Sequence, residues 1–109
     1  MSAANRRKGA DAEREVIHIL RDAGWGDARR TSDGRDQAAR GDIANGPQAT
    51  HLEIKRQEAL NVPKALRQVQ ADANPLDLPV LVHRPSGQKW MATLPFDELL
   101  ALLQMREAA

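Results

Sequence analysis

The sequence predicts an α/β fold in which a mixed central sheet of about five strands is flanked by helices. Apolar residues recur with helical spacing at residues 6–23, 62–74 and 96–106, and short alternating or continuous apolar runs occur at 50–55 and 78–83. The predicted order is therefore helix, strand, hairpin strand, strand, helix, strand, strand, helix, which is typical of helices packed on a mixed sheet. Residues 1–109 suffice for one domain with one core.

The first helix is predicted at residues 6–23, and Gly24 is its natural stop. Its apolar stripe consists of Val16, Ile17 and Leu20. At about 100° per residue, Glu13 projects into the middle of that stripe, whereas Glu15 projects toward solvent. A carboxylate on a buried face is unfavourable unless it is paired or bound to a metal. Glu13 is therefore a candidate metal ligand, and the alternative is that it lies at the exposed end of the stripe.

Residues 25–41 are predicted to contain a strand and a long loop. The chain is expected to enter a strand over residues 25–28, and the strand is expected to end near Arg30. Residues 29–41 lack apolar periodicity and contain many turn-forming residues. Loops of about ten residues in small domains are usually functional or disordered, so the arginines of this loop are candidates for phosphate contacts. An ordinary solvated loop is the alternative.

Residues 41–55 predict a β-hairpin that carries two acids and a lysine. Asn45 and Gly46 tolerate the positive φ that a tight turn requires. In the alternating strand at residues 50–55, Glu53 and Lys55 share one face and are roughly 6.5–7 Å apart along the strand. Asp42 is expected on or beside the neighbouring strand, across the turn. The hairpin thus brings two carboxylates and one ammonium group together.

This combination suits metal-assisted hydrolysis of a phosphodiester. Two neighbouring carboxylates repel each other, so one takes up a proton or a cation joins them. Oxygen ligands favour Mg²⁺ or Mn²⁺, and a nearby lysine offsets charge that develops at phosphorus. The bare pattern also arises by chance on a solvated face, because 28% of the residues are charged. His51 shares the face of Glu53 and is expected to be a bystander.

The second half of the chain predicts two helices around two strands. Asn61 is expected to cap a helix that reaches about residue 74, and buried strands follow at 78–83 and 88–93. Pro95 introduces a C-terminal helix through about residue 106. The expected buried stripe of that helix consists of Phe96, Leu99, Leu100 and Leu103. Leu102 and Met105 lie outside it, so this helix is a candidate partner surface; a frayed end is the alternative.

Composition and charge limit the functional classes. The net charge is +1, yet residues 6–56 contain 11 basic and 9 acidic side chains, so three metal-bound acids would leave a positive surface suited to a polyanion. An ordinary mixed surface is the alternative. The chain has no cysteine, which excludes disulfides and thiolate metal sites and fits a reducing cytoplasm. No apolar run approaches the ~20 residues needed to cross a bilayer, so no membrane partner is expected.

Several segments, in order, resemble archaeal-type Holliday junction resolvases, members of the PD-(D/E)xK nuclease superfamily. The resemblance spans about residues 6–94 and includes residues 7–15, 30–32, 41–43, 52–55, 79–82 and Trp90. Small resolvase-like proteins of bacteriophages and prophages have a similar layout. Gly41 replaces the proline that names the motif, a common variation. The resemblance implies a restriction-endonuclease-like sandwich.

The resemblance also assigns roles to individual residues. It implies that Glu13, Asp42 and Glu53 bind Mg²⁺, for which Mn²⁺ substitutes, with help from the Ile54 carbonyl. Lys55 matches the catalytic lysine, which helps to place the attacking hydroxide. The residues expected to hold the DNA backbone are Arg6, Arg7, Lys8, Arg29, Arg30, Ser32 and Arg35.

We therefore expect a Mg²⁺-dependent endodeoxyribonuclease that resolves Holliday junctions or related branched DNA, leaving a 5′-phosphate and a 3′-hydroxyl. Cutting two opposed strands requires two active sites, hence a homodimer. The expected location is the cytoplasm of a bacterial or phage-infected cell. One alternative is a nicking, flap or restriction-like endonuclease on the same fold. Another is a non-catalytic DNA-binding recombination accessory protein, which would be expected to lack one of the acids or the lysine.

Overall fold

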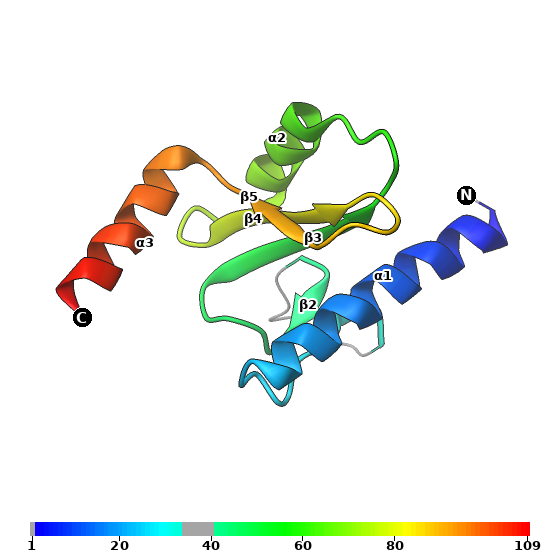
Figure 1. The fold of residues 1–109 in the computed structure, drawn as a ribbon, viewed down its shortest axis with the longest axis horizontal. Coiled ribbons are helices and arrows are strands. Elements are labelled where there is room, and N and C mark those ends of the chain that lie inside the picture. The colour runs from blue at the N-terminus through cyan, green and yellow to red at the C-terminus, as the bar shows by residue number, and fades with distance from the viewer. Residues whose placement is uncertain (1, 34–40) are drawn as a thin grey trace.

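The computed structural model describes residues 2–33 and 41–109 and has an α/β fold with three helices and five strands (Figure 1). The elements in chain order are α1 (Ala3–Asp22), β1 (Arg29–Arg30), the short 3₁₀ helix η1 (Thr31–Asp33), β2 (Ile43–Ala44), β3 (Thr50–Arg56), α2 (Val62–Asp72), β4 (Leu78–Arg84), β5 (Met91–Thr93) and α3 (Phe96–Ala108). The predicted α/β class with a mixed sheet is confirmed. The strands form two small sheets instead of one central sheet of five.

The larger sheet has the order β3-β4-β5, with β3 parallel to β4 and β4 antiparallel to β5. β3 and β4 pair along seven residues, which places Glu53 opposite Leu81 and Lys55 opposite His83. The smaller sheet contains β1 and β2 in antiparallel pairing. A parallel bridge between Gly41 and Leu52 links the segment before β2 to β3.

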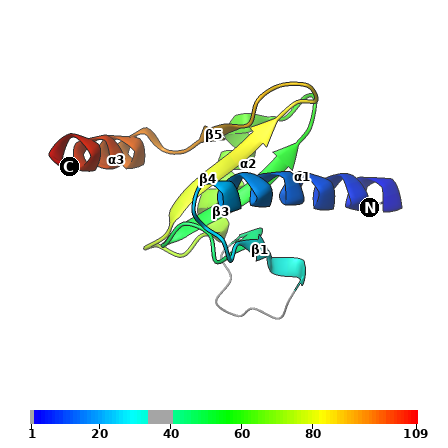
Figure 2. The same cartoon turned by 60° about the horizontal axis from the view of Figure 1, so that its bottom comes forward.

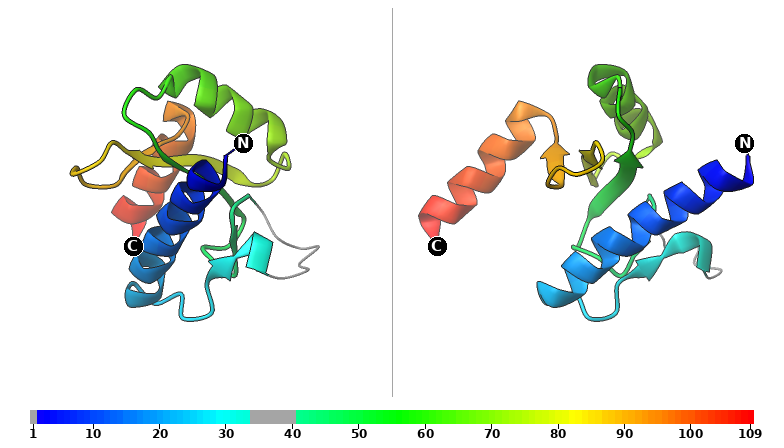
Figure 3. Two further views of the ribbon diagram at one scale, coloured as in Figure 1. Left: turned by 90° about the vertical axis from the view of Figure 1, so that its right-hand side faces the viewer. Right: turned by 45° about the vertical axis from the view of Figure 1, so that its right-hand side comes forward.

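Helices α1 and α2 cover opposite faces of the larger sheet (Figures 1 and 3). Successive side chains of a strand point to opposite faces, so Leu52 and Ile54 pack toward α1 while Glu53 and Lys55 lie on the side of α2. The core beneath α1 also contains Ala12, Val16, Ile17, Ala28, Ile43 and Val80. This alternation is what turns the acidic and basic residues of β3 away from the main core.

Helix α1 forms where the periodicity predicts it, although it begins three residues earlier. The Ser2 hydroxyl caps it by accepting a hydrogen bond from the Asn5 N–H at 3.1 Å. Gly24, with a φ of 117°, follows its end. Ala12, Val16 and Ile17 are buried, and the Glu13 side chain is 17% exposed. Glu13 therefore lies on the buried face of α1, as its spacing from Val16 and Ile17 predicts.

The first strand ends at Arg30 as predicted, but residues 25–28 form a turn instead of its beginning. The Trp25 N–H donates to the Leu20 carbonyl at 3.0 Å and the Ala28 N–H donates to the Trp25 carbonyl at 3.1 Å, so the chain turns back tightly after α1. The positive φ of Gly24 permits this turn. Strand pairing begins only at β1.

The hairpin predicted between residues 42 and 55 is also wrong. Asn45 has the expected positive φ of 59°, but β2 pairs with β1 and β3 pairs in parallel with β4. The β4 run of apolar residues offers β3 seven paired positions, whereas β2 is two residues long. The longer and more buried pairing therefore determines the partner of β3.

The second half matches the predicted order of elements. Asn61 caps α2 by accepting the Lys64 N–H at 3.1 Å, and the helix ends at Asp72, two residues earlier than predicted. Strand β4 runs one residue beyond its predicted end, and β5 is limited to Met91–Thr93. Figure 2 shows β5 leading through a short connection into α3, which extends away from the body of the molecule.

The predicted burial of α3 is wrong, because the helix has no buried residue. Phe96 is 69% exposed and Leu103 is 41% exposed, although both belong to the expected buried stripe. No helix or strand among residues 2–33 and 41–109 packs extensively against α3. The Cα radius of gyration is 14.0 Å, compared with about 13 Å for a compact chain of this length. The projecting helix accounts for this extended shape (Figures 1 and 3).

Candidate functional site

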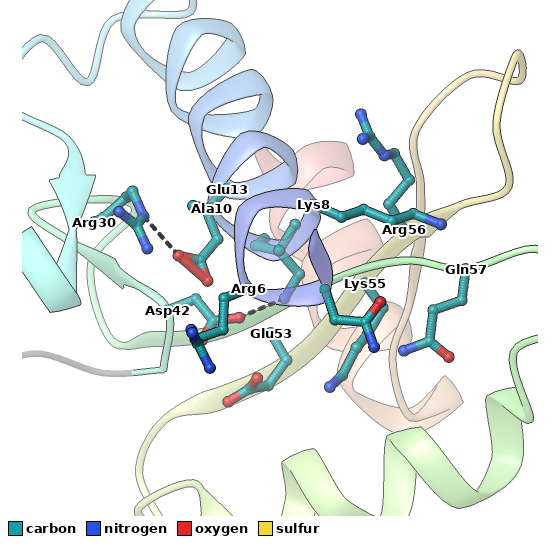
Figure 4. Close-up of a pocket in the computed structure, with 13 residues that line it drawn as sticks. Arg6, Lys8, Ala10, Glu13, Arg30, Asp42, Glu53, Lys55, Arg56 and Gln57 are labelled. Carbon is teal, nitrogen blue, oxygen red and sulfur yellow. Dashed lines mark hydrogen bonds and ion pairs between the residues drawn. The ribbon is translucent and has the colours of Figure 1, made fainter. Parts of the chain in front are cut away.

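A cavity of about 680 Å³ lies between the N-terminal half of α1 and the C-terminal end of β3 (Figure 4). Glu13, Asp42 and Glu53 point into it from three different parts of the chain. Lys55 and Ile54 complete the set of predicted site residues on its wall. The other lining residues are Asn5, Arg6, Lys8, Gly9, Ala10, Arg30, Arg56 and Gln57. The fold thus gathers all five predicted residues around one space.

Asp42 is held against β3 by its own backbone and side chain. Its N–H donates to the Leu52 carbonyl at 2.8 Å, and its Oδ2 accepts the Ile54 N–H at 2.8 Å. Gly41 makes this approach possible, because a Cβ at that position would lie 2.4 Å from the Leu52 carbonyl oxygen and its φ is +70°. The glycine before the acid is therefore required by close backbone contact.

Glu53 lies on β3 between His51 and Lys55 on the same face. The Nε2 of His51 is 3.2 Å from the Glu53 Oε1, a distance at which an Nε2–H donates to the carboxylate. The His51 side chain is buried and the Glu53 side chain is 22% exposed. His51 therefore contacts a site residue and orients it, which corrects its interpretation as a bystander. The shared strand face was the available signal, because residues two apart on a strand lie side by side.

Burial raises the pKa of both central carboxyls, and repulsion from Glu53 adds to the rise at Asp42. The pKa of Asp42 rises to about 6, first because burial disfavours the charged form and second because Glu53 is close. Burial also raises the pKa of Glu53, and the hydrogen bond with Asp42 and the charge of Lys55 oppose this rise. In the protein without a bound cation, Asp42 therefore keeps its proton up to about pH 6 and ionises above that pH.

Glu13 is engaged by an arginine. The Arg30 Nε lies 2.8 Å from the Glu13 Oε1, and both side chains are mostly buried. Within residues 2–33 and 41–109, no three histidine, aspartate or glutamate side chains form a group that could hold a metal ion. The arrangement therefore combines a close carboxylate pair, Asp42 and Glu53, with a third carboxylate that is neutralised by Arg30. The role of Glu13 as a ligand stays a prediction.

The predicted DNA-contact residues do not all lie at the main cavity. Arg6, Lys8 and Arg30 line the cavity. Arg29 borders a separate cavity of about 210 Å³ beside α1. The exposed residues Arg7 and Ser32 do not line the main cavity, and Arg35 lies outside the described residues. Helix α1 therefore supplies two of the basic residues that line the cavity, Arg6 and Lys8.

Glu15 and Arg56 were missed by the sequence analysis. The Glu15 Oε2 lies 2.6 Å from Arg56 Nη1 and its Oε1 lies 2.5 Å from Arg84 Nη2, so Glu15 does not simply point to solvent as predicted. The Arg84 guanidinium also stacks over the Trp90 ring at 5.0 Å. Because β3 and β4 are parallel and in register, their ends bring both arginines to α1. The cluster fixes the end of β3 that carries Lys55.

A second cavity of about 500 Å³ adjoins the first on the side of α2. The two cavities share Glu53, Lys55 and Gln57. Its α2 wall includes Gln68, whose amide donates to Asp72 at 3.1 Å. The site is therefore accessible from two sides of β3, which suits an extended substrate better than a small enclosed one.

Comparisons with protein-family models, with curated proteins and with solved structures find no match for this chain. None of the helices in the described ranges is both long enough and apolar enough to span a membrane.

Proposed function

We propose that this protein is a divalent-metal-dependent endodeoxyribonuclease with a restriction-endonuclease-like fold, related to Holliday junction resolvases. The observation that carries the proposal is the close pair of half-buried carboxyls, Asp42 and Glu53, beside Lys55 in a cavity with a basic rim. A carboxyl whose pKa is raised by burial and by a neighbouring acid, as that of Asp42 is, is typical of functional sites. The order of the site residues along the chain also agrees with the resemblance stated above.

The donor groups at the site fit a hard divalent cation. Asp42 keeps a proton up to about pH 6 beside Glu53, so the pair gains by exchanging it for a cation, and oxygen donors favour Mg²⁺ or Mn²⁺. In this proposal Asp42, Glu53 and the Ile54 carbonyl would hold the ion. Glu13, which is paired with Arg30, would be available as a third carboxylate if a substrate phosphate bound Arg30. When bound, the cation supplies Lewis acidity that activates water and offsets phosphate charge.

The remaining site residues position and stabilise the substrate. The Lys55 ammonium lies beside the carboxylates and donates to a phosphate oxygen on which negative charge develops. Arg6, Lys8 and Arg30 bind neighbouring phosphates through charge, without reading bases. His51 keeps Glu53 oriented by its hydrogen bond. Together these groups promote hydrolysis of a phosphodiester, because their positive charges stabilise the negative charge that develops on the phosphate.

The proposed substrate is branched DNA, and the Holliday junction is the first candidate. A site open on two sides of β3 accepts a strand that passes through it, and the basic rim contacts backbone instead of bases. A nicking, flap or restriction-like endonuclease is the second candidate within this class. The site also has the charge expected of a non-catalytic DNA-binding protein, but such a protein has no need for the buried carboxylate pair.

A strand-resolved digest of synthetic four-way junctions tests the proposal. We expect cleavage with Mg²⁺, none with EDTA, and none by Asp42→Asn. Asp11→Asn is the matched control, because Asp11 is an exposed α1 residue that pairs with Arg14 outside the cavity. Equal amounts of cleavage product from wild type and Asp42→Asn would show that Asp42 is not catalytic and would overturn the proposal. Linear, nicked and flapped duplexes in parallel reactions distinguish a junction resolvase from the other nucleases.

A further inference from the structure

Helix α3 presents the largest uncovered apolar surface in the described part of the chain. Its exposed residues include Phe96 at 69%, Leu100 at 44%, Leu102 at 43%, Leu103 at 41% and Met105 at 68%. The helix carries apolar side chains around most of its circumference, and it has no buried residue. A helix of this composition is normally covered on at least one side. The residues that the structure describes do not provide that cover.

The charges on α3 form a self-complementary pattern. Glu98, Leu102 and Arg106 are spaced four residues apart and therefore lie in one row along the helix. Neither Glu98 nor Arg106 forms an ion pair with another described residue of its chain. In an antiparallel pair of such helices centred on Leu102, position 98 of one copy lies opposite position 106 of the other. The acid of each helix then faces the base of its partner.

We propose that α3 is the dimerisation surface of this protein and that it packs antiparallel to α3 of a second copy, about a two-fold axis at Leu102. The two Leu102 side chains meet at the centre. Leu99 of one helix then faces Met105 of the other, and two Glu98–Arg106 ion pairs flank the apolar contact. Such an arrangement is isologous, because the same surface serves both partners.

The pairing face contains the exposed apolar residues Leu102 and Met105. Phe96, Leu100 and Leu103 lie about 100–160° from Leu102 round the helix and stay outside this contact. The opposite charges at the two ends of the row, more than buried area, therefore define the pairing. Because α3 projects from the body (Figure 3), two copies meet through it without obstructing the cavity beside α1. The inference does not depend on the proposed nuclease activity.

Charge-reversal variants test the pairing by sedimentation velocity over a concentration series, without DNA or metal. We expect wild type to dimerise. Glu98→Arg and Arg106→Glu should each raise the dissociation constant of the dimer at least tenfold, because each variant alone places like charges at both contacts. An equimolar mixture of the two variants should dimerise at near wild-type strength, since both contacts are again oppositely charged. Asp97→Arg, about 100° round the helix, should leave the dimer unchanged.

A second pair of variants tests the apolar centre. Leu102→Glu should abolish the dimer, whereas Gln104→Glu, which adds the same charge on the other side of the helix, should not. A monomeric wild type, or a mixture no tighter than the single variants, would overturn the proposal. A monomeric wild type that binds phosphatidylcholine vesicles would also overturn it and would assign the helix to a lipid surface. Rescue in the mixture excludes misfolding as the cause of weakening.

Discussion

The position of the Asp42 carboxyl group lowers the stability of the folded protein when the group is ionised. It is partly buried, it lies next to Glu53, and it receives one compensating hydrogen bond from the Ile54 N–H. Burial and repulsion raise its pKa from 3.8 to about 6. A carboxyl group with a raised folded-state pKa destabilises the protein once it ionises.

We predict that Asp42→Asn stabilises the metal-free protein at high pH. The folded state binds more protons than the unfolded state between pH 4 and about 6, so wild type loses stability as pH rises through this range. Asparagine retains the bond from Ile54 and carries no charge, so the variant should gain roughly 3 kcal/mol at pH 8 and nothing near pH 3. Urea unfolding with EDTA measures this. Equal stability at pH 8, or a gain by the Asp11→Asn control, would contradict it.

Lys55 contributes at the residue scale through its charge. We predict that Lys55→Ala lowers the rate of junction cleavage by at least about 100-fold, because it removes a donor to the developing negative charge. Its thermal unfolding should differ little from that of wild type, since Lys55 is not part of the core. Lys89→Ala, in the exposed turn between β4 and β5, is the control and should keep full activity. Full activity of Lys55→Ala would remove the lysine from the mechanism.

At the scale of elements, the approach of the Gly41–Asp42 segment to β3 creates the carboxylate pair. Asp42 is separated from Glu53 by β2 and a turn, and a parallel bridge and two hydrogen bonds bring it to β3. The bridge lies where a side chain on residue 41 has no room. The geometry of the site therefore depends on one glycine that carries no functional group.

Two glycine substitutions with opposite outcomes test this dependence. Gly41→Ala should lower the free energy of unfolding by about 2 kcal/mol or more, because its Cβ would meet the Leu52 carbonyl at a φ of +70°. Gly9→Ala, inside α1 with no atom near its Cβ, should raise it by up to about 1 kcal/mol. Urea unfolding of both variants provides the comparison. A stable Gly41→Ala protein would show that Asp42 is held in another way.

The elements differ in how far local sequence predicted them. Helix α1 follows from apolar spacing and α2 from the Asn61 cap, and both occur near their predicted bounds. The spacing of α3 also predicts a helix, but its predicted buried stripe is exposed. Periodicity specifies which residues share a helix face, and it does not specify whether another element of the same chain covers that face.

At the scale of the whole molecule, a net charge of +1 conceals an uneven distribution. Arg6, Lys8, Arg30 and Arg56 line the same cavity as the carboxylates, and α1 supplies the first two of these cations. A basic rim around an acidic centre attracts DNA and also keeps a site for a divalent cation. Binding to DNA should then depend strongly on salt.

We predict that the affinity for DNA falls steeply as the salt concentration rises. In a plot of the logarithm of the binding constant against the logarithm of the salt concentration, the double substitution Arg6→Ala and Lys8→Ala should make the slope shallower by about 2, because each phosphate contact contributes about 0.9. Fluorescence anisotropy with EDTA measures binding without cleavage. The control is Arg67→Ala with Lys89→Ala, which removes the same charge from exposed positions outside the cavity. An equal loss of slope in the control would show that binding follows net charge alone.

The sequence alone determined the helices, the strands β3 and β4, and the common face of Glu53 and Lys55, because these depend on spacing within a few residues. Tertiary structure decided that β2 pairs with β1, that Arg30 neutralises Glu13, and that Glu15 joins the ends of β3 and β4 to α1. It also left α3 uncovered. Each of these outcomes depends on which distant segments pack together, and residue spacing within one segment carries no information about that choice.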